Sequence, residues 1–84
     1  MTENSPSLDQ TLRLVSEVIG AAVPSAQANF FDVGGDSLTA AFLSLLLEER
    51  LGASVDVFTI YAAENIMEIH DAVVAVLAVR QVAV

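Results

Sequence analysis

Apolar residues recur every three or four positions in three separate segments of this 84-residue chain. This period is typical of helices that bury one face, and it predicts helices over residues 8–20, 37–51 and about 65–79. Residue types that often cap helices bound these segments: Ser7, Gly20, Gly52 and Asn65. Three main helices in a chain of this length indicate a small helical bundle.

The chain is expected to form one domain. Residues 1–7 are polar and include a proline, which predicts a flexible leader. The domain then covers residues 8–79, and residues 80–84 are expected to be a frayed tail.

Two connections between the predicted helices are less regular. Residues 21–36 are rich in turn-forming residues, yet they also hold the adjacent pair Phe30 and Phe31. Two neighbouring phenylalanines favour a loop that folds back over the core. Residues 59–64 include Thr59 and Tyr61, which favour a strand, whereas their position between helices favours a short helical turn.

Charge and composition exclude several classes of protein. Eleven acidic residues against three arginines give a net charge of −8, so the chain lacks the basic footprint of proteins that bind nucleic acid or anionic membranes. The absence of cysteine excludes a disulfide scaffold, a thiolate zinc site and a thiol enzyme. The most apolar stretch, residues 38–47, is about half as long as the ~20 residues of a membrane span. Because no signal-peptide pattern precedes it, a cytoplasmic location is expected.

The helix predicted over residues 37–51 carries two apolar stripes instead of one. On a helical wheel, the first consists of Ala40, Leu43, Leu47 and Leu51. The second consists of Leu38, Ala41, Phe42 and Leu45, with Leu46 at its edge. Either this helix is more buried than usual, or one stripe packs on the core and the other contacts partner proteins.

Ser37 follows two glycines and an aspartate at the start of the same helix. The glycines allow a sharp turn and a close approach of another group. A phosphate attached to the Ser37 hydroxyl would be stabilised there by free N–H groups and the positive end of the helix dipole. The alternative is that Ser37 or Asp36 is only the N-cap of the helix.

Residues 35–38 also spell the Gly-Asp-Ser-Leu tetrapeptide of the GDSL hydrolases, in which the serine is a nucleophile. Such a serine needs a histidine base and an orienting acid. The single histidine, His70, is followed by Asp71, which does not reproduce that family's Asp-x-x-His pairing, so His70 is expected to be a bundle or surface residue. A Walker phosphate loop is excluded because it needs a lysine and this chain has none. A calcium loop that begins at Asp32 would need a glutamate where this chain has Leu43, so no metal site is expected.

The run over residues 29–38, Asn-Phe-Phe-Asp-Val-Gly-Gly-Asp-Ser-Leu, resembles the signature of acyl and peptidyl carrier proteins. Its Phe-Phe and Gly-Gly forms are similar to the peptidyl carrier, or thiolation, domains of nonribosomal peptide synthesis. The resemblance covers about residues 8–79. It implies a four-helix bundle with three main helices, a short third helix and a long loop between the first two.

The resemblance also implies how the chain functions. Ser37 would carry covalent 4′-phosphopantetheine, with Asp36, Gly35 and Leu38 around the attachment point. A phosphopantetheinyl transferase would transfer this group from coenzyme A, and its thiol would hold an amino acid or acyl group as a thioester. The chain would have no catalytic site of its own. As a monomer, it would meet an adenylation enzyme and downstream condensation, tailoring or thioesterase enzymes.

The family pattern places the first stripe of the 37–51 helix in the core, and Leu38, Phe42 and Leu45 on the partner side. Because the family's third-helix region also contacts partners, Tyr61 is expected either to determine specificity or to pack on the bundle. The chain departs from the pattern at Ala28, where the family usually has an acid. Other departures are Asp36, where many peptide carriers have histidine, and residues 59–64, which lack the usual proline.

Three hypotheses follow for function. The first is a peptidyl carrier, and the second is an acyl carrier of polyketide or fatty-acid synthesis. The third is a helical interaction module that never bears the cofactor.

Overall fold

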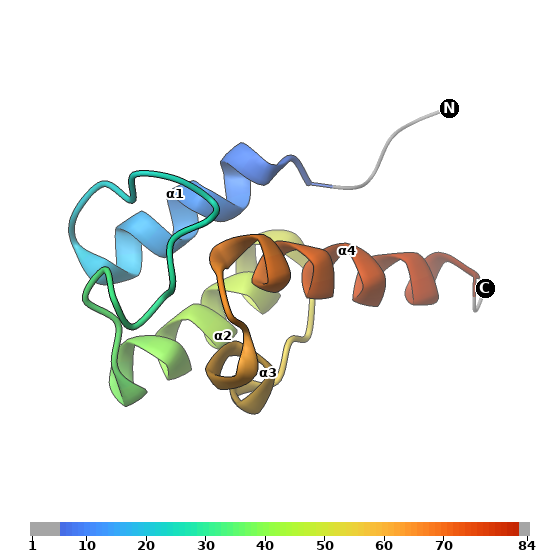
Figure 1. The fold of residues 1–84 in the computed structure, drawn as a ribbon. Coiled ribbons are helices and arrows are strands. Elements are labelled where there is room, and N and C mark those ends of the chain that lie inside the picture. Colours follow the sequence, from blue (N-terminus) through green and yellow to red (C-terminus); the bar gives the residue numbers. More distant parts are fainter. Residues whose placement is uncertain (1–5, 83–84) are drawn as a thin grey trace.

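Four helices make up the structure of residues 6–82, the residues that the computed structural model describes. In chain order they are α1 (Leu8–Ile19), α2 (Ser37–Leu51), α3 (Val57–Ala62) and α4 (Ile66–Val82) (Figure 1). No strand occurs within residues 6–82. This all-α architecture, with a short third helix and a long loop between α1 and α2, confirms the predicted fold class.

Helix α1 begins and ends at the predicted caps. The Ser7 hydroxyl accepts a hydrogen bond from the backbone N–H of Gln10, and the Gln10 side chain accepts one from the backbone N–H of Ser7. These reciprocal bonds satisfy donors that the start of a helix leaves open. Gly20 ends the helix with φ 85°, so α1 is one residue shorter than the predicted range 8–20.

Helix α2 has the predicted bounds, and α3 accounts for most of the ambiguous segment. Helix α3 begins at Val57, two residues before that segment, and ends at Ala62. Its Ile60 side chain is fully buried in the core. Packing of this side chain therefore overrides the strand preference of Thr59 and Tyr61.

Helix α4 starts where the long loop meets it. The Asn65 side chain accepts a hydrogen bond of 3.0 Å from a backbone N–H in the first turn, as expected of the N-cap. The N–H groups of Ile66 and Met67 donate to the carbonyls of Ala28 and Ala26, at 3.0 and 2.9 Å. The loop thus satisfies donors that the first turn of α4 leaves open.

The C-terminal end of α4 differs from the prediction. The helix continues to Val82, beyond the expected end at Val79, because no glycine or proline stops it. In Figure 1 this half of α4 extends past the other helices. Residues 80–82 of the expected frayed tail are therefore helical, whereas residues 83–84, like residues 1–5 of the expected leader, lie outside the described part of the chain.

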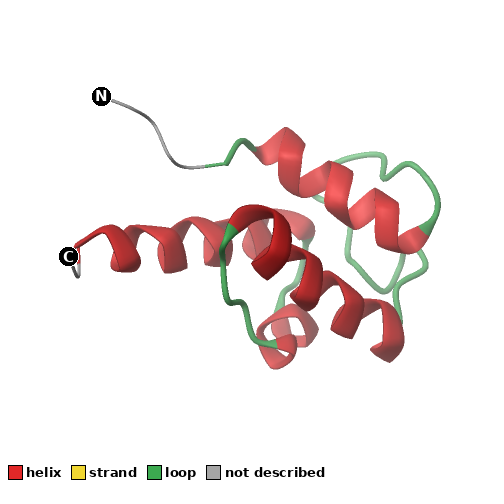
Figure 2. Cartoon of the chain, turned by 180° about the vertical axis from the view of Figure 1, so that it is seen from behind, coloured by secondary structure: helices red, strands yellow, loops and turns green. Residues whose placement is uncertain are grey.

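All four helices and the long loop contribute side chains to one core. Figure 2 shows these helices and the loops that connect them from the opposite side. Its fully buried apolar side chains include Val15, Phe30, Leu43, Leu47, Ile60, Ile66, Ile69 and Val73. The loop does fold over the core, although only Phe30 of the phenylalanine pair is buried. Within residues 6–82, no helix is long and apolar enough to cross a membrane.

Candidate functional site

Ser37 is the first residue of α2 and is exposed. The residue before it, Asp36, is the N-cap: its carboxylate accepts a hydrogen bond of 2.9 Å from the N–H of Thr39. The Thr39 hydroxyl in turn accepts one of 2.7 Å from the N–H of Asp36. Because these bonds complete the helix start without the Ser37 hydroxyl, the capping role belongs to Asp36. Ser37 is left at the positive end of the α2 dipole.

The capping bonds also affect the ionisation of Asp36. The hydrogen bond from the Thr39 backbone N–H lowers the pKa of this carboxyl below its ordinary value, and the bond from the Thr39 hydroxyl lowers it further. The Asp36 side chain is therefore ionised at neutral pH, which adds a negative charge beside Ser37.

Two glycines shape the turn before Ser37. Gly34 has φ 115°, in the left-handed region that few other residues adopt. Gly35 packs directly against Phe30: its N–H donates to the Phe30 carbonyl at 2.9 Å, and a β-carbon at Gly35 would overlap the Phe30 ring. Since Phe30 is fully buried, it has little room to move away.

Asn29 ties this loop to the corner between α3 and α4. Its side-chain oxygen accepts hydrogen bonds from the N–H groups of Phe31 and Asp32, at 2.9 and 3.1 Å. Its side-chain nitrogen donates to the Glu64 carbonyl at 3.1 Å. Together with the two backbone bonds that α4 donates, these contacts hold the loop firmly although Ala28 replaces the family's usual acid.

The two apolar stripes of α2 have different environments. In the first stripe Ala40, Leu43 and Leu47 are fully buried and Leu51 is half-buried. In the second stripe Leu38, Phe42 and Leu45 are 65%, 52% and 50% exposed, and Ala41 is exposed as well. Leu46, at the edge, packs partly against the core. The second stripe is thus an apolar surface on the helix that Ser37 begins, and α2 is not a fully buried helix.

Three aromatic rings form a further exposed apolar surface on α3 and the adjoining loop. The ring of Tyr61 stacks on Phe31, with centroids 5.7 Å apart and 17° between the planes. The Phe58 centroid lies 6.1 Å from that of Tyr61, and Phe58 is 71% exposed. Sequence reasoning missed Phe31 and Phe58 as surface residues. The three-residue spacing of Phe58 and Tyr61 indicates a shared helical face only once α3 is assigned as a helix.

His70, on α4, contacts a residue of α1. Its Nδ1 lies 2.8 Å from the hydroxyl of Thr11, a fully buried residue of α1, so it is a bundle histidine as predicted. Within the described part of the chain, no three histidine, aspartate or glutamate side chains are grouped to hold a metal ion.

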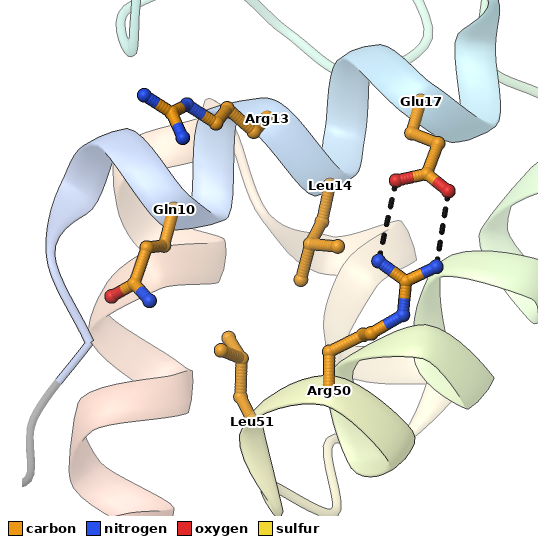
Figure 3. Close-up of a pocket in the computed structure, with 6 residues that line it drawn as sticks. All are labelled: Gln10, Arg13, Leu14, Glu17, Arg50 and Leu51. Atoms are coloured by element: carbon orange, nitrogen blue, oxygen red, sulfur yellow. Dashed lines mark hydrogen bonds and ion pairs between the residues drawn. The ribbon is translucent and has the colours of Figure 1, made fainter.

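A pocket lies at the opposite end of α2 (Figure 3). It is lined by Gln10, Arg13, Leu14, Glu17, Arg50 and Leu51. Arg50 and Glu17 form an ion pair of 3.2 Å between α2 and α1. Helix α2 has 15 residues, so Ser37 and Leu51 are separated by about 20 Å along its axis. The pocket is therefore separate from the Ser37 region.

Comparison with known proteins gives one partial match among curated sequences. The nonribosomal peptide synthetase acrB of Aspergillus aculeatus is 56% identical to this chain over 36 residues, which cover 43% of this chain and 2% of the synthetase. The chain thus corresponds to a small fraction of that relative's length. No solved structure matches the chain significantly.

The family model described as "Phosphopantetheine attachment site" (PP-binding) matches residues 9–73. This range covers most of the chain and reaches from the first turn of α1 into α4. Proteins of this family are non-catalytic carriers that hold 4′-phosphopantetheine covalently on a serine. The chain belongs to the phosphopantetheine attachment family, and it is a carrier domain.

Proposed function

We propose that Ser37 is the attachment serine and that the chain is a peptidyl carrier of nonribosomal peptide synthesis. The observation that carries the proposal is the position of Ser37: an exposed hydroxyl at the first residue of α2, next to a cap that does not use it. A transferase can reach such a hydroxyl without unfolding any part of the bundle.

The surroundings of Ser37 fit a phosphodiester. The positive end of the α2 dipole favours a negative group at this hydroxyl. Gly35 packs against the buried Phe30 in the turn before Ser37, and Leu38, the residue after Ser37, is exposed. When bound, the group supplies a terminal thiol for thioester formation, a function that this cysteine-free chain has no side chain to perform.

The exposed stripe of α2 is proposed as the surface that partner enzymes contact. Leu38, Phe42 and Leu45 give it an apolar surface, and Tyr61 on α3 is the proposed specificity residue. The net charge of −8 favours partners with basic surfaces and accelerates encounter with them. The proposed partners are a phosphopantetheinyl transferase, an adenylation enzyme and later condensation, tailoring or thioesterase enzymes.

Two observations favour a peptidyl carrier over an acyl carrier. The Phe30–Phe31 and Gly34–Gly35 pairs resemble thiolation domains, and the curated relative is named a nonribosomal peptide synthetase. An acyl carrier of polyketide or fatty-acid synthesis is the second candidate. Family membership argues against the third hypothesis, a module without cofactor.

Intact mass spectrometry tests the attachment site. The chain is incubated with coenzyme A, magnesium and a promiscuous phosphopantetheinyl transferase. We expect the mass of one phosphopantetheine on the wild type and on Ser54→Ala, a control at another exposed serine, and none on Ser37→Ala. No gain on the wild type, or an equal gain on Ser37→Ala, would contradict the proposal.

Loading of the modified chain separates the two kinds of carrier. An adenylation enzyme with its amino acid is compared with an acyltransferase and its acyl donor. Peptide chemistry predicts loading by the adenylation enzyme; loading by the acyltransferase alone would support the acyl carrier instead.

A further inference from the structure

We propose that Tyr61 is a positioning residue: through its stack on Phe31, it holds the turn that presents the Ser37 hydroxyl to the transferase. This inference rests on the proposed attachment at Ser37. It is separate from the direct partner contact proposed above for Tyr61: specificity would depend on the exposed part of this side chain, whereas positioning depends on its contact with Phe31.

A series of contacts joins Tyr61 to the turn before Ser37. The Tyr61 ring lies nearly parallel to Phe31, with centroids 5.7 Å apart. Phe31 meets Phe30 edge to face, at 5.5 Å and 80°. Phe30 in turn packs against Gly35, which lies two residues before Ser37. A displacement of the Tyr61 ring would therefore shift the turn before Ser37 through these contacts.

Hydrogen bonds hold the loop both before this turn and at its start. The carbonyls of Ala26 and Ala28 accept from α4, and the Asn29 side chain links the N–H groups of Phe31 and Asp32 to the Glu64 carbonyl. The turn over residues 31–35 is closed by its own backbone bonds, from Gly34 to the Phe31 carbonyl and from Gly35 to the Phe30 carbonyl. These bonds set the internal shape of the turn. Asn29 holds the start of the turn at the corner between α3 and α4, and the stack of Phe31 on Tyr61 is the contact that the turn makes with α3 itself.

Helix α3 offers a firm support for this stack. Ile60, the residue before Tyr61, is fully buried and anchors the helix in the core. Tyr61 itself is 37% exposed. Truncation of Tyr61 therefore removes the stack while α3 stays in place.

Phe58 is a matched control on the same helix face. It is 71% exposed, and its ring contact is with Tyr61. If the aromatic surface of α3 bound the transferase directly, Phe58→Ala would impair the reaction at least as much as Tyr61→Ala. If Tyr61 positions the turn, Tyr61→Ala alone has a large effect.

The test measures kcat and KM for transfer of phosphopantetheine from coenzyme A to the full chain by a promiscuous transferase. We expect Tyr61→Ala to lower kcat about three- to tenfold, the fold-change that corresponds to the interaction energy of one aromatic pair. The KM should change little, because misplacement of an acceptor hydroxyl affects the reacting geometry more than binding. Tyr61→Phe, which keeps the ring, and Phe58→Ala should stay within about twofold of the wild type.

A second variant tests the stack from its other side. Phe31→Leu should reproduce the loss of kcat, and it decides the question if Tyr61→Ala does not fold. Tyr61 is the single tyrosine, and the chain has no tryptophan. The tyrosine signal in the near-UV circular dichroism of Phe31→Leu therefore reports on the environment of the Tyr61 ring. We expect this signal to weaken while the far-UV helical spectrum is unchanged.

Three results would overturn the inference. One is a kcat equal to that of the wild type in either of the folded variants, Tyr61→Ala or Phe31→Leu. Another is an equal loss in Phe58→Ala, which would make the α3 surface a docking site. The third is a wild-type chain that gains no mass, which removes the proposed function and this inference with it.

Discussion

Gly35 lies against the buried ring of Phe30, and a side chain at this position would collide with it. An added β-carbon would lie 2.7 Å from the Phe30 carbonyl oxygen as well as overlapping the ring. Two residues further on, Ser37 is exposed at the start of α2. One turn therefore fixes both the burial of Phe30 and the exposure of Ser37.

Gly35→Ala is expected to destabilise the chain by about 1–3 kcal/mol, because overpacking against a fixed core ring forces the turn to shift. The same shift should slow modification of Ser37. Urea denaturation followed by circular dichroism measures the first effect, and the rate of mass gain with the transferase measures the second.

Gly20→Ala serves as the control for this substitution. Gly20 has φ 85°, and nothing lies within 4 Å of an added β-carbon. Only backbone strain is introduced, which costs about 1 kcal/mol, and modification of Ser37 should proceed at the wild-type rate. If Gly35→Ala also left that rate unchanged, the turn would not depend on its contact with Phe30.

The stability of the chain should depend on ionisation of the Asp36 cap. Because the Thr39 N–H lowers the pKa of Asp36 in the folded state, the ionised cap stabilises the fold above the ordinary pKa of aspartate. This contribution is lost as the pH falls through the lowered pKa. Asp36→Asn keeps a good N-cap but does not titrate, so it isolates the effect from the other acids.

The measurement compares urea unfolding of the wild type and Asp36→Asn at several pH values. We expect the wild type to be the more stable at neutral pH. Its advantage should shrink as the pH falls below about 4. An equal advantage at about pH 7 and about pH 3 would show that the charge of Asp36 plays no part in the cap.

The sequence predicts the helical elements well because local signals define them. Spacing and capping residues place α1 within one residue and α2 without error. The end of α4 is missed because the valine-rich segment over residues 73–82 contains no glycine or proline to mark a stop, so only the folded chain shows that the helix continues to Val82.

The sequence predicts less of the surroundings of Ser37, because these depend on contacts between distant segments. The donation of Asn29 to the Glu64 carbonyl joins residues 35 positions apart, and the stack of Phe31 on Tyr61 joins residues 30 positions apart. No period or motif indicates such a pair. Likewise, the choice between Asp36 and Ser37 as cap is decided by geometry, since both residue types cap helices equally well.

The two stripes of α2 should respond differently to truncation. Leu43→Ala removes a fully buried side chain and is expected to cost about 2–5 kcal/mol of unfolding free energy. Phe42→Ala and Leu45→Ala remove half-exposed side chains and should cost less than about 1.5 kcal/mol. They should instead slow modification and loading, measured by intact mass. Normal rates combined with a core-sized loss of stability would show that the assignment of the stripes is wrong.

The contact between Thr11 and His70 should stabilise the packing of α1 on α4. Thr11 is fully buried and its hydroxyl lies 2.8 Å from His70 Nδ1, so Thr11→Val leaves the imidazole without this partner. We expect a loss of about 1–2 kcal/mol in unfolding free energy. A double-mutant cycle with His70→Leu separates this bond from changes in packing, and a coupling energy of about 1 kcal/mol is expected. A coupling energy near zero would mean that the helices are held together by their apolar side chains alone.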